Sequence, residues 1–405
     1  MTNLFADKHL ILGVTGSIAA YKAADLASRL TQAGAAVDVI LTEAATRFVA
    51  PLTFGAVTGR PARTDADLWD AGQHVPHVAL GEQADVVLIA PATADFIAKL
   101  ALGLAGDLLG VTALAARGPL LVAPAMDGGM YAHPATQANL ATLRARGVQI
   151  LGPGRGRMAS GLIGEGRMLE PAEIVEHVRL RLAQGGPLRG RRVVVTAGGT
   201  QEPLDPVRYV TNRSSGKQGY ALAQAALDRG AEVVLISASH TEPPLGARVV
   251  PVGTAQEMLA AVMAEAPQAD VLLMAAAVAD YRPADPAEQK LKKQGEAPLT
   301  LLLVQNPDIL KAVAAQRKET RRPGLVVGFA AETAGLLEHA REKLEAKGLD
   351  LIVANDVAAP DAGFEVDTNR VMLLDAGGGI EQLPLMSKAD VAEHVVDWVA
   401  ARLVH

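Results

Sequence analysis

His9–Ser17 reads HLILGVTGS, a short aliphatic run that ends in a turn with two glycines. Apolar residues at helical spacing follow from Ile18 to Gln32. This order of strand, turn and helix is typical of the first unit of an α/β fold. Further aliphatic runs at Ala36–Leu41 and Asp85–Ala90 are continuous rather than alternating. Such runs predict strands of a parallel sheet that is covered on both faces.

A second α/β pattern begins after Gln184–Arg192 (QGGPLRGRR), a segment rich in Gly, Pro and Arg. It predicts a strand at Arg192–Thr196, a helix at about Gly216–Arg229 and a strand at Ala231–Ser237. With 405 residues, the chain is too long for one ordinary domain. We therefore predict two Rossmann-like doubly wound α/β domains with mainly parallel sheets, at residues 1–188 and 189–405.

The two halves share a strand-to-loop junction. Ala84–Asp95 (ADVVLIAPATAD) parallels Ala269–Asp280 (ADVLLMAAAVAD). Similar packing needs could account for the apolar part, but the shared terminal aspartate is harder to explain that way. Because ligands of open parallel sheets bind beyond the carboxyl ends of the strands, Asp95 and Asp280 are expected at the two sites.

Composition limits the function classes. The formal net charge of -6 provides no overall basic field for a nucleic-acid backbone or an anionic membrane, so a small anionic ligand fits better. The absence of cysteine excludes disulfides, thiolate nucleophiles and cysteine metal sites. The N-terminal residues do not resemble a signal sequence, and no run reaches the roughly 20 apolar residues of a membrane span. We expect a soluble, cytoplasmic protein that binds neither nucleic acid nor membrane.

Gly16 and Ser17 stand at the start of the first predicted helix. Free backbone N–H groups and the positive end of the helix dipole suit a phosphate monoester there. Gly13 and Gly16 do not complete the G-x-G-x-x-G dinucleotide fingerprint, and no acidic residue is clearly placed for a ribose. A mononucleotide phosphate is therefore a better match than NAD, and an NAD-dependent oxidoreductase is disfavoured. A plain tight turn remains the alternative.

Three further motifs follow: His77 ahead of Pro91–Asp95 (PATAD), then Pro124–Met126 (PAM), then Ala159–Pro171 (ASGLIGEGRMLEP). In these motifs and their order, the segment from about Leu10 to Val178 resembles the flavin-dependent cysteine decarboxylases. The resemblance implies a flavodoxin-like domain with FMN. It would decarboxylate 4′-phosphopantothenoylcysteine to 4′-phosphopantetheine, by oxidation of the thiol-bearing carbon, loss of carbon dioxide from the thioaldehyde, and return of the hydride.

The resemblance also assigns roles. His77 matches the catalytic histidine and can titrate near neutrality, as a base must; a satisfied surface or capping histidine is the alternative. FMN is expected on Gly16, Ser17, Thr42, Pro91, Ala92, Thr93, Ala94 and Asp95. The substrate is expected on Met126 and on a glycine-rich clamp formed by Gly161, Gly164, Gly166, Arg167 and Met168.

Two positions depart from the pattern of these decarboxylases. Asp127 stands where some relatives have Asn, and an ionised carboxylate would repel the substrate carboxylate. Asp127 could instead be protonated or orient His77. Ser160 stands where some relatives have the cysteine that donates the last proton, and it could relay a proton from water unless another group donates it. Both residues are catalytic candidates, and a catalytically silent flavin-binding domain stays open as the alternative.

Val195–Gly219 (VTAGGTQEPLDPVRYVTNRSSGKQG) lies between a predicted strand and a predicted helix. Ser214, Ser215 and Gly216 can direct hydrogen-bond donors at an anion, and Lys217 adds positive charge. The spacing is not that of a P-loop, so no Walker-type ATPase is inferred.

Together with AAAVADYRP, KLKKQ, NPDIL, VVGFAAET and LIVANDV, this segment makes Arg192 to about Val399 resemble the phosphopantothenate–cysteine ligases. A decarboxylase domain followed by this ligase resembles the bacterial bifunctional coenzyme A biosynthesis family. The implied reaction begins with attack of the 4′-phosphopantothenate carboxylate on the α-phosphate of CTP. The resulting acyl-cytidylate then reacts with the amine of cysteine, which displaces CMP. Mg²⁺ and lysines should stabilise charge on the triphosphate, although no metal ligand can be assigned.

By the same resemblance, Asn212 should contact the acyl-cytidylate. Lys343 and Lys347 lie four residues apart, so they share one helix face and could meet phosphates together; a solvated helix edge is the alternative. Lys292 and Lys293 stay ambiguous. The resemblance also implies a homo-oligomer, a trimer or a multiple of trimers. The residues expected around CTP are Ala275, Asp280, Lys290, Pro307, Asp308, Ile309, Leu310, Phe329, Lys343 and Lys347.

Overall fold

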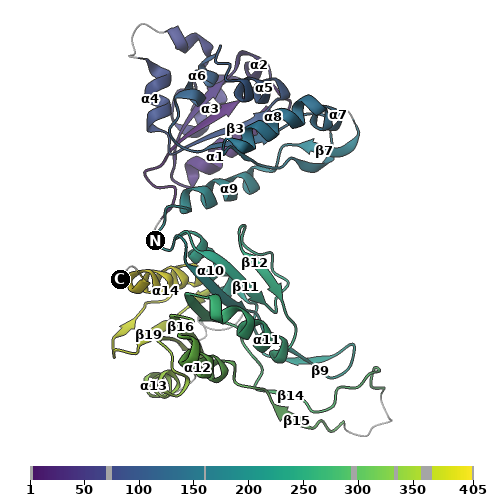
Figure 1. The fold of residues 1–405 in the computed structure, drawn as a ribbon, viewed down its shortest axis with the longest axis vertical. Helices are drawn as coiled ribbons and strands as arrows, with labels where there is room; N and C mark the ends of the chain where they lie inside the picture. The colour runs from purple at the N-terminus through teal and green to yellow at the C-terminus, as the bar shows by residue number, and fades with distance from the viewer. Residues whose placement is uncertain are drawn as a thin grey trace. The chain divides into compact units, whose positions relative to one another are not determined.

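The computed structural model describes residues 3–69, 75–158, 161–292, 299–332, 336–356 and 367–403. The chain divides into two compact units (Figure 1). We call Asn3–Leu182 the N-terminal unit and Ala183–His405 the C-terminal unit. The division falls in the helix that precedes the Gly- and Pro-rich segment, close to the predicted boundary at residue 188.

The N-terminal unit is built on a five-stranded parallel sheet with the strand order β2-β1-β3-β4-β5. This order is that of flavodoxin-like folds, and it confirms the predicted fold class. The chain places β2 on one side of β1 and β3, β4 and β5 on the other side. The loops after β1 and β3 therefore lie next to each other at the carboxyl ends of the strands. The strands are β1 (His9–Val14), β2 (Ala36–Leu41), β3 (Val86–Ala92), β4 (Leu120–Pro124) and β5 (Gln149–Ile150).

Hydrophobic cores cover both faces of this sheet. Leu10 and Leu12 of β1 pack in one core, while the intervening Ile11 packs in the other, as the alternation of side chains along a strand requires. This arrangement explains why the strands read as continuous aliphatic runs. The helices are α1 (Ala20–Gln32), α2 (Glu43–Thr46), α3 (Pro51–Thr58), η1 (Asp65–Trp69), α4 (Pro76–Gln83), α5 (Ala94–Leu102), α6 (Leu108–Ala115), α7 (Gly128–Ala132), α8 (Pro134–Ala145) and α9 (Pro171–Ala183).

A two-stranded antiparallel hairpin stands apart from the main sheet of this unit. It pairs β6 (Gly154–Arg157) with β7 (Ile163–Arg167), and it carries the predicted clamp. Gly164 lies opposite Gly156 in the pairing register. The absence of side chains at such positions lets another backbone approach closely.

The C-terminal unit contains an eight-stranded sheet with the order β12-β11-β8-β13-β16-β17-β19-β20. The first six strands in this order are parallel and follow the Rossmann pattern, with β19 and β20 added antiparallel at one edge. The strands are β8 (Arg192–Ala197), β11 (Glu232–Ser237), β12 (Arg248–Pro251), β13 (Val271–Met274), β16 (Leu325–Glu332), β17 (Leu351–Asp356), β19 (Val371–Asp375) and β20 (Ile380–Gln382).

Two-stranded pairs and helices complete this unit. The pairs are β9 (Gln201–Pro203) with β10 (Tyr209–Thr211), β14 (Tyr281–Pro283) with β15 (Leu303–Gln305), and β18 (Thr368–Asn369) with β21 (Met386–Ser387). The helices are α10 (Lys217–Leu227), α11 (Ala255–Glu265), η2 (Ala266–Gln268), α12 (Ile309–Thr320), α13 (Leu336–Lys347) and α14 (Lys388–Leu403). Within the described ranges, no helix is both long and apolar enough to cross a lipid bilayer.

The repeated junction seen in the sequence occupies equivalent places in the two units. Both β3 and β13 lie directly beside the first strand of their own sheet, β1 and β8. The loop that follows each of them therefore leaves the sheet where the direction of winding changes, which is where ligands bind in such folds.

Candidate functional site

Thr15 joins the two central loops of the N-terminal unit. Its Oγ1 donates a hydrogen bond to the backbone oxygen of Pro91 at 2.8 Å and accepts one from the backbone N–H of Thr93 at 3.0 Å. The Thr15 side chain is 1% exposed, so both bonds are shielded from water. The turn that holds Gly16 and Ser17 is thereby fixed against the PATAD loop.

The loop after β2 joins the same edge of the sheet. Thr42 donates its backbone N–H to the oxygen of Val14 at 3.0 Å, and its side chain caps α2. A Cβ on Gly16 would lie 2.4 Å from the Cβ of Ala44, so only glycine lets these two loops approach this closely. The predicted flavin residues Gly16, Ser17, Thr42 and Thr93 therefore belong to adjoining loops.

Helix α5 begins directly after β3. Thr93 is its N-cap, and its side chain accepts a hydrogen bond from the N–H of Phe96. Asp95 lies in the first turn and forms an exposed ion pair with Lys99 at 3.1 Å. The hydrogen bond from this carboxylate raises the pKa of Lys99. Ala92 is buried at the end of β3, whereas Asp95 faces solvent beside the loop edge.

The PAM segment links the sheet to the clamp hairpin. Ala125 donates its N–H to the oxygen of Ala92, and Met126 donates its N–H to the oxygen of Gly166, both at 2.9 Å. Gly166 has a φ of 144°, and a Cβ there would lie 2.3 Å from the oxygen of Met126. This contact requires glycine, because any side chain would separate the hairpin from the PAM segment.

Other clamp residues differ in their surroundings. Gly161, at a φ of 85°, closes the hairpin turn by donating its N–H to Met158. Arg167 forms an ion pair with Glu170 at 3.1 Å. Met168 is 2% exposed and packs in the hydrophobic core, and its contact with substrate stays a prediction. Ser160 lies outside the described residues.

Asp127 caps helix α7, since its side chain accepts a hydrogen bond from the N–H of Gly129 at 3.0 Å. His77 lies in the first turn of α4, and its buried Nδ1 has no hydrogen-bond partner among the described residues. Figure 1 shows α4 on one side of the N-terminal unit and α7 with β7 on the other. The suggestion that Asp127 orients His77 therefore stays a prediction.

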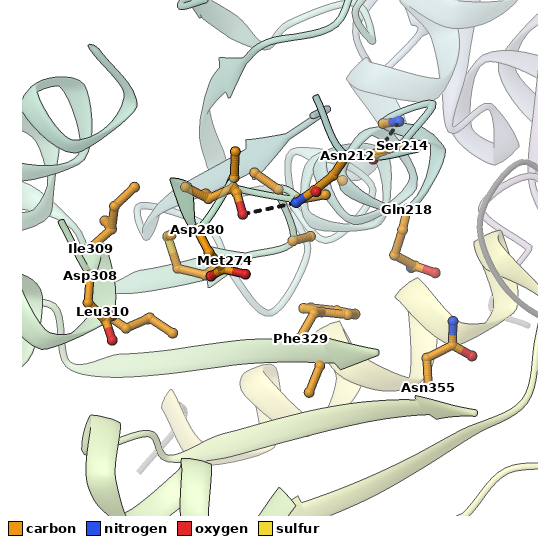
Figure 2. A pocket seen from close by; sticks show the side chains of 18 of the residues that line it. Asn212, Ser214, Gln218, Met274, Asp280, Asp308, Ile309, Leu310, Phe329 and Asn355 are labelled. Carbon is orange, nitrogen blue, oxygen red and sulfur yellow. Dashed lines mark hydrogen bonds between the residues drawn. The ribbon is translucent and has the colours of Figure 1, made fainter. Parts of the chain in front are cut away.

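The C-terminal unit contains a cleft of about 760 Å³ at the carboxyl ends of β13 and β16. It gathers residues that stand far apart in the sequence. Figure 2 shows Asp308, Ile309 and Leu310 at one end, Gln218 and Asn355 at the other, and Phe329 between them. Predicted residues that line the cleft are Asn212, Ala275, Asp280, Pro307, Asp308, Ile309, Leu310, Phe329, Lys343 and Lys347.

Two threonines, Thr196 in β8 and Thr200 between β8 and β9, fix the loop after β13 by accepting hydrogen bonds from it. Ala276 donates its N–H to Thr196 Oγ1 at 3.1 Å, and Ala279 donates its N–H to Thr200 Oγ1 at 2.9 Å. Both threonines are fully buried. This arrangement matches that of Thr15 in the N-terminal unit, where a threonine after the first strand also holds the neighbouring loop.

Helices α12 and α13 supply charge at one end of the cleft. Asp308 caps α12 by accepting the N–H of Lys311 at 3.2 Å, and its other oxygen lies 3.7 Å from Lys347 Nζ. Lys343 lines the cleft one turn earlier on α13, so the two lysines share a face as predicted. Lys290 is exposed and is not among the residues that line the cleft. Its role therefore stays a prediction.

Several lining residues had no assigned role from the sequence. Gln218, Asn355, Asn369 and Lys388 come from four elements and meet at one end of the cleft. Asn355 stood in a motif that we quoted, but nothing in the sequence indicated that Asn369 and Lys388 would lie beside it. Within the described ranges, no group of three or more His, Asp or Glu side chains could hold a metal ion.

Comparisons with known proteins agree with both units. Residues 3–183 match the Flavoprotein family. Residues 188–403 match the DNA/pantothenate metabolism flavoprotein C-terminal domain. The chain is also similar to a solved structure of the C-terminal domain of coenzyme A biosynthesis bifunctional protein CoaBC. That match has 37% identity, covers 54% of this chain and 98% of the other, and has a TM-score of 0.46.

Curated relatives match over nearly the full length. The Vibrio vulnificus (strain CMCP6) coenzyme A biosynthesis bifunctional protein CoaBC is 46% identical, and the match covers 99% of both chains. The protein of the same name from Mycobacterium tuberculosis (strain H37Rv) is 49% identical over 98% of this chain and 97% of its own. The chain therefore belongs to the family of bifunctional coenzyme A biosynthesis proteins.

Proposed function

We propose that this chain makes 4′-phosphopantetheine in two steps. The C-terminal unit joins cysteine to 4′-phosphopantothenate with CTP, and the N-terminal unit decarboxylates the product with FMN. The proposal rests on the cleft of the C-terminal unit. This cleft is lined by Asn212, Asp280, Asn306–Leu310, Phe329, Lys343 and Lys347. A cytoplasmic location stays a prediction.

In the ligase step, cleft residues position the acid and the nucleotide. Asn212 contacts the acyl-cytidylate, and Lys343 and Lys347 stabilise the negative charge of the nucleotide. Mg²⁺ would supply positive charge for the triphosphate, and Asp280 and Asp308, two carboxylates that line the cleft, would hold it. Activation by CTP is needed because a carboxylate is a poor acyl donor.

The loops of the N-terminal unit fit a flavin mononucleotide. Gly16 packs closely against Ala44, and Thr15 accepts a hydrogen bond from the backbone N–H of Thr93. These contacts fix the loops at the carboxyl ends of the strands before a ligand binds. Gly16, Ser17, Thr42 and the Pro91–Asp95 loop would hold FMN, which would supply the redox chemistry of the decarboxylation. The chain's residues orient the substrate: the clamp covers it and excludes water, and His77 moves a proton.

The decarboxylase site needs more than one copy of the chain. His77 and the clamp lie on opposite sides of the N-terminal unit (Figure 1). Large apolar side chains near the flavin loops are exposed, including Ile18 at 60% and Leu52 at 82%. Apolar side chains that one copy leaves exposed become covered when copies associate. We therefore propose that a homo-oligomer, a trimer or a multiple of it, brings His77 of one copy to the clamp of another.

Purified protein tests both activities. Pyrophosphate release should require both CTP and 4′-phosphopantothenate, and ATP, GTP and UTP should replace CTP poorly. A yellow protein with bound FMN should release carbon dioxide from 4′-phosphopantothenoylcysteine, and His77→Asn should abolish that release. Ligation without carbon dioxide release would favour the alternative, a ligase with a catalytically silent flavin-binding unit.

A further inference from the structure

One end of the cleft carries a group of polar side chains that the nucleotide assignment does not use. Figure 2 shows Gln218 and Asn355 at this end, away from Asp308 and Leu310. Lys388 also lines it, from the first residue of α14. We call this region the amide end of the cleft.

Three amide side chains form a chain of hydrogen bonds, which we call the relay, and in it each donor and each acceptor is fixed. Gln218 Nε2 donates to the backbone oxygen of Lys388 at 3.1 Å, and a backbone oxygen can only accept. The oxygen of Gln218 therefore faces Asn369, whose Nδ2 donates to it at 3.2 Å. In turn Asn369 Oδ1 accepts a hydrogen bond from Asn355 Nδ2 at 3.3 Å. The anchoring carbonyl thus settles the orientation of all three amides.

The relay leaves one acceptor unused. With Nδ2 committed to Asn369, Asn355 must present Oδ1 as an acceptor. This oxygen is buried and has no hydrogen-bond partner among the described residues. A buried polar atom without a partner costs free energy, so a ligand that donates a hydrogen bond here would be favoured. Turning the amide over would break the bond with Asn369 Oδ1.

Two lysines give the same end a positive charge. Lys388 is 8% exposed, and Lys217 stands at the start of α10. Asp367 forms its ion pair with Lys217 rather than with Lys388. Burial, followed by the like charge of Lys217, lowers the pKa of Lys388, and the negative charge of Asp367 opposes this shift only in part. A buried ammonium near a second lysine favours an anionic ligand group.

The amide end therefore suits a ligand with an anion and a hydrogen-bond donor close together. A polyphosphate supplies the anion, but at neutral pH it has few protons to donate to Asn355 Oδ1. The amino-acid substrate of the proposed ligase carries a carboxylate and an amino group on the same carbon. We propose that Lys388, with Lys217, binds the α-carboxylate of this amino acid, and that Asn355 Oδ1 accepts a hydrogen bond from its amino group. This proposal rests on the ligase function.

Such an arrangement would also aid the reaction. The amino group must lose a proton before it can attack, and nearby lysines lower the pKa of an ammonium through like-charge repulsion. The nitrogen lone pair then attacks the acyl carbon, and the bond from that carbon to the phosphate oxygen breaks. CMP leaves with the electron pair, and the nitrogen loses a second proton to water. The amide bond of the product is complete.

Cysteine carries a carboxylate and an amino group, whereas cysteamine carries only the amino group. Comparing the two substrates therefore distinguishes the carboxylate contact of Lys388 from the amino-group contact of Asn355. In Lys388→Met, kcat/KM for cysteine should fall roughly 10- to 100-fold, as expected for loss of a charge-assisted contact. The same constant for cysteamine should change less than threefold. Lys388→Arg should restore part of the preference for cysteine. Lys318→Met, on the exposed face of α12, serves as the matched control and should behave like the wild type.

Asn355→Leu should instead slow both amines, because both carry the amino group. Pyrophosphate formed from CTP and 4′-phosphopantothenate without any amine should keep its burst amplitude in every variant. If Lys388→Met lowers that burst or raises KM for CTP, Lys388 belongs to the nucleotide site and the proposal is wrong. Should Lys388→Met misfold, Lys217→Met carries the same test.

A failure of the proposed ligase function gives a different experimental result from a failure of the amino-acid subsite. A wild-type protein that forms no pyrophosphate from CTP and 4′-phosphopantothenate contradicts the proposed function. A wild-type protein with a normal burst that uses cysteamine as well as cysteine contradicts only the amino-acid subsite.

Discussion

Asn212 donates a hydrogen bond from its Nδ2 to the backbone oxygen of Val278 at 3.1 Å (Figure 2). This bond ties the loop after β10 to the loop after β13, and both loops line the cleft. It holds the amide of Asn212 in one orientation, so that Oδ1 is left to interact with a ligand. A side chain expected to contact the acyl-cytidylate is therefore positioned before any substrate arrives.

Replacing Asn212 should affect only one activity. In Asn212→Asp, the donor to Val278 is lost and a carboxylate faces a carbonyl oxygen, so we expect the ligase kcat to fall at least tenfold. Carbon dioxide release from added 4′-phosphopantothenoylcysteine should not change. Assaying both activities on the same preparation provides the control, and equal losses in both would contradict this account.

Thr15→Val should weaken flavin binding. The variant keeps the shape of the side chain but removes the hydroxyl that joins Pro91 to Thr93, which leaves the N–H of Thr93 without its partner. We expect a loss of about 1–3 kcal/mol in stability of the N-terminal unit and lower flavin content after purification. The control is Thr142→Val, an exposed threonine that bonds only within α8. Flavin content equal to that of the wild type would show that this contact does not shape the site.

The clamp hairpin should tolerate no side chain at residue 166. Gly166→Ala places a Cβ against the oxygen of Met126 and adds strain at a positive φ. We expect decarboxylation to fall more than tenfold while ligation is retained. Gly161→Ala is a useful comparison, because it has strain from a positive φ but no atom within 4 Å of the added Cβ. Equal effects of the two changes would mean that strain, rather than contact with the PAM segment, is responsible.

Much of this fold could be predicted because its strands are aliphatic runs that end at turns. β2 begins and ends at the predicted residues, and β1 begins with the aliphatic run at His9. Helix α1 begins at Ala20 rather than Ile18, because Ser17 first forms a turn with Thr15 and its side chain accepts the N–H of Ala19. Such local hydrogen bonds are not visible in a hydrophobic pattern.

The site was only partly predictable, for a related reason. Motifs indicated Asp280 and the Pro307–Leu310 segment, which line the cleft and lie shortly after β13 and β15. Lys388 and Asn369 reach the cleft through tertiary packing of α14 and β18, which no local pattern encodes. Met168 belongs to the clamp motif but packs in the core, which the motif alone does not indicate.

Asp205 provides a pH-dependent test. A hydrogen bond from Arg208, followed by backbone N–H groups that include Leu291, keeps the pKa of Asp205 well below its ordinary value. These contacts also anchor the segment beside Lys290, so Asp205→Asn should raise KM for CTP.

The sign of the pH effect follows from the lowered pKa. An acid with a lowered folded-state pKa contributes stability that is complete above its unfolded pKa, roughly 4 for Asp, and is lost as the pH falls below it. The Tm difference between the wild type and Asp205→Asn should therefore be constant from pH 8 to pH 5 and narrow below about pH 4. If the Tm difference narrowed near pH 6, the titration of a group other than Asp205 would be responsible.

The central claim is that two units of one chain carry out two consecutive reactions. The most direct measurement is to incubate the purified protein with 4′-phosphopantothenate, cysteine, CTP and Mg²⁺ and to follow the products by mass spectrometry. We predict that 4′-phosphopantothenoylcysteine appears first and is converted to 4′-phosphopantetheine, with one CMP formed per product. Consumption of CTP without either cysteine-containing product would contradict the account.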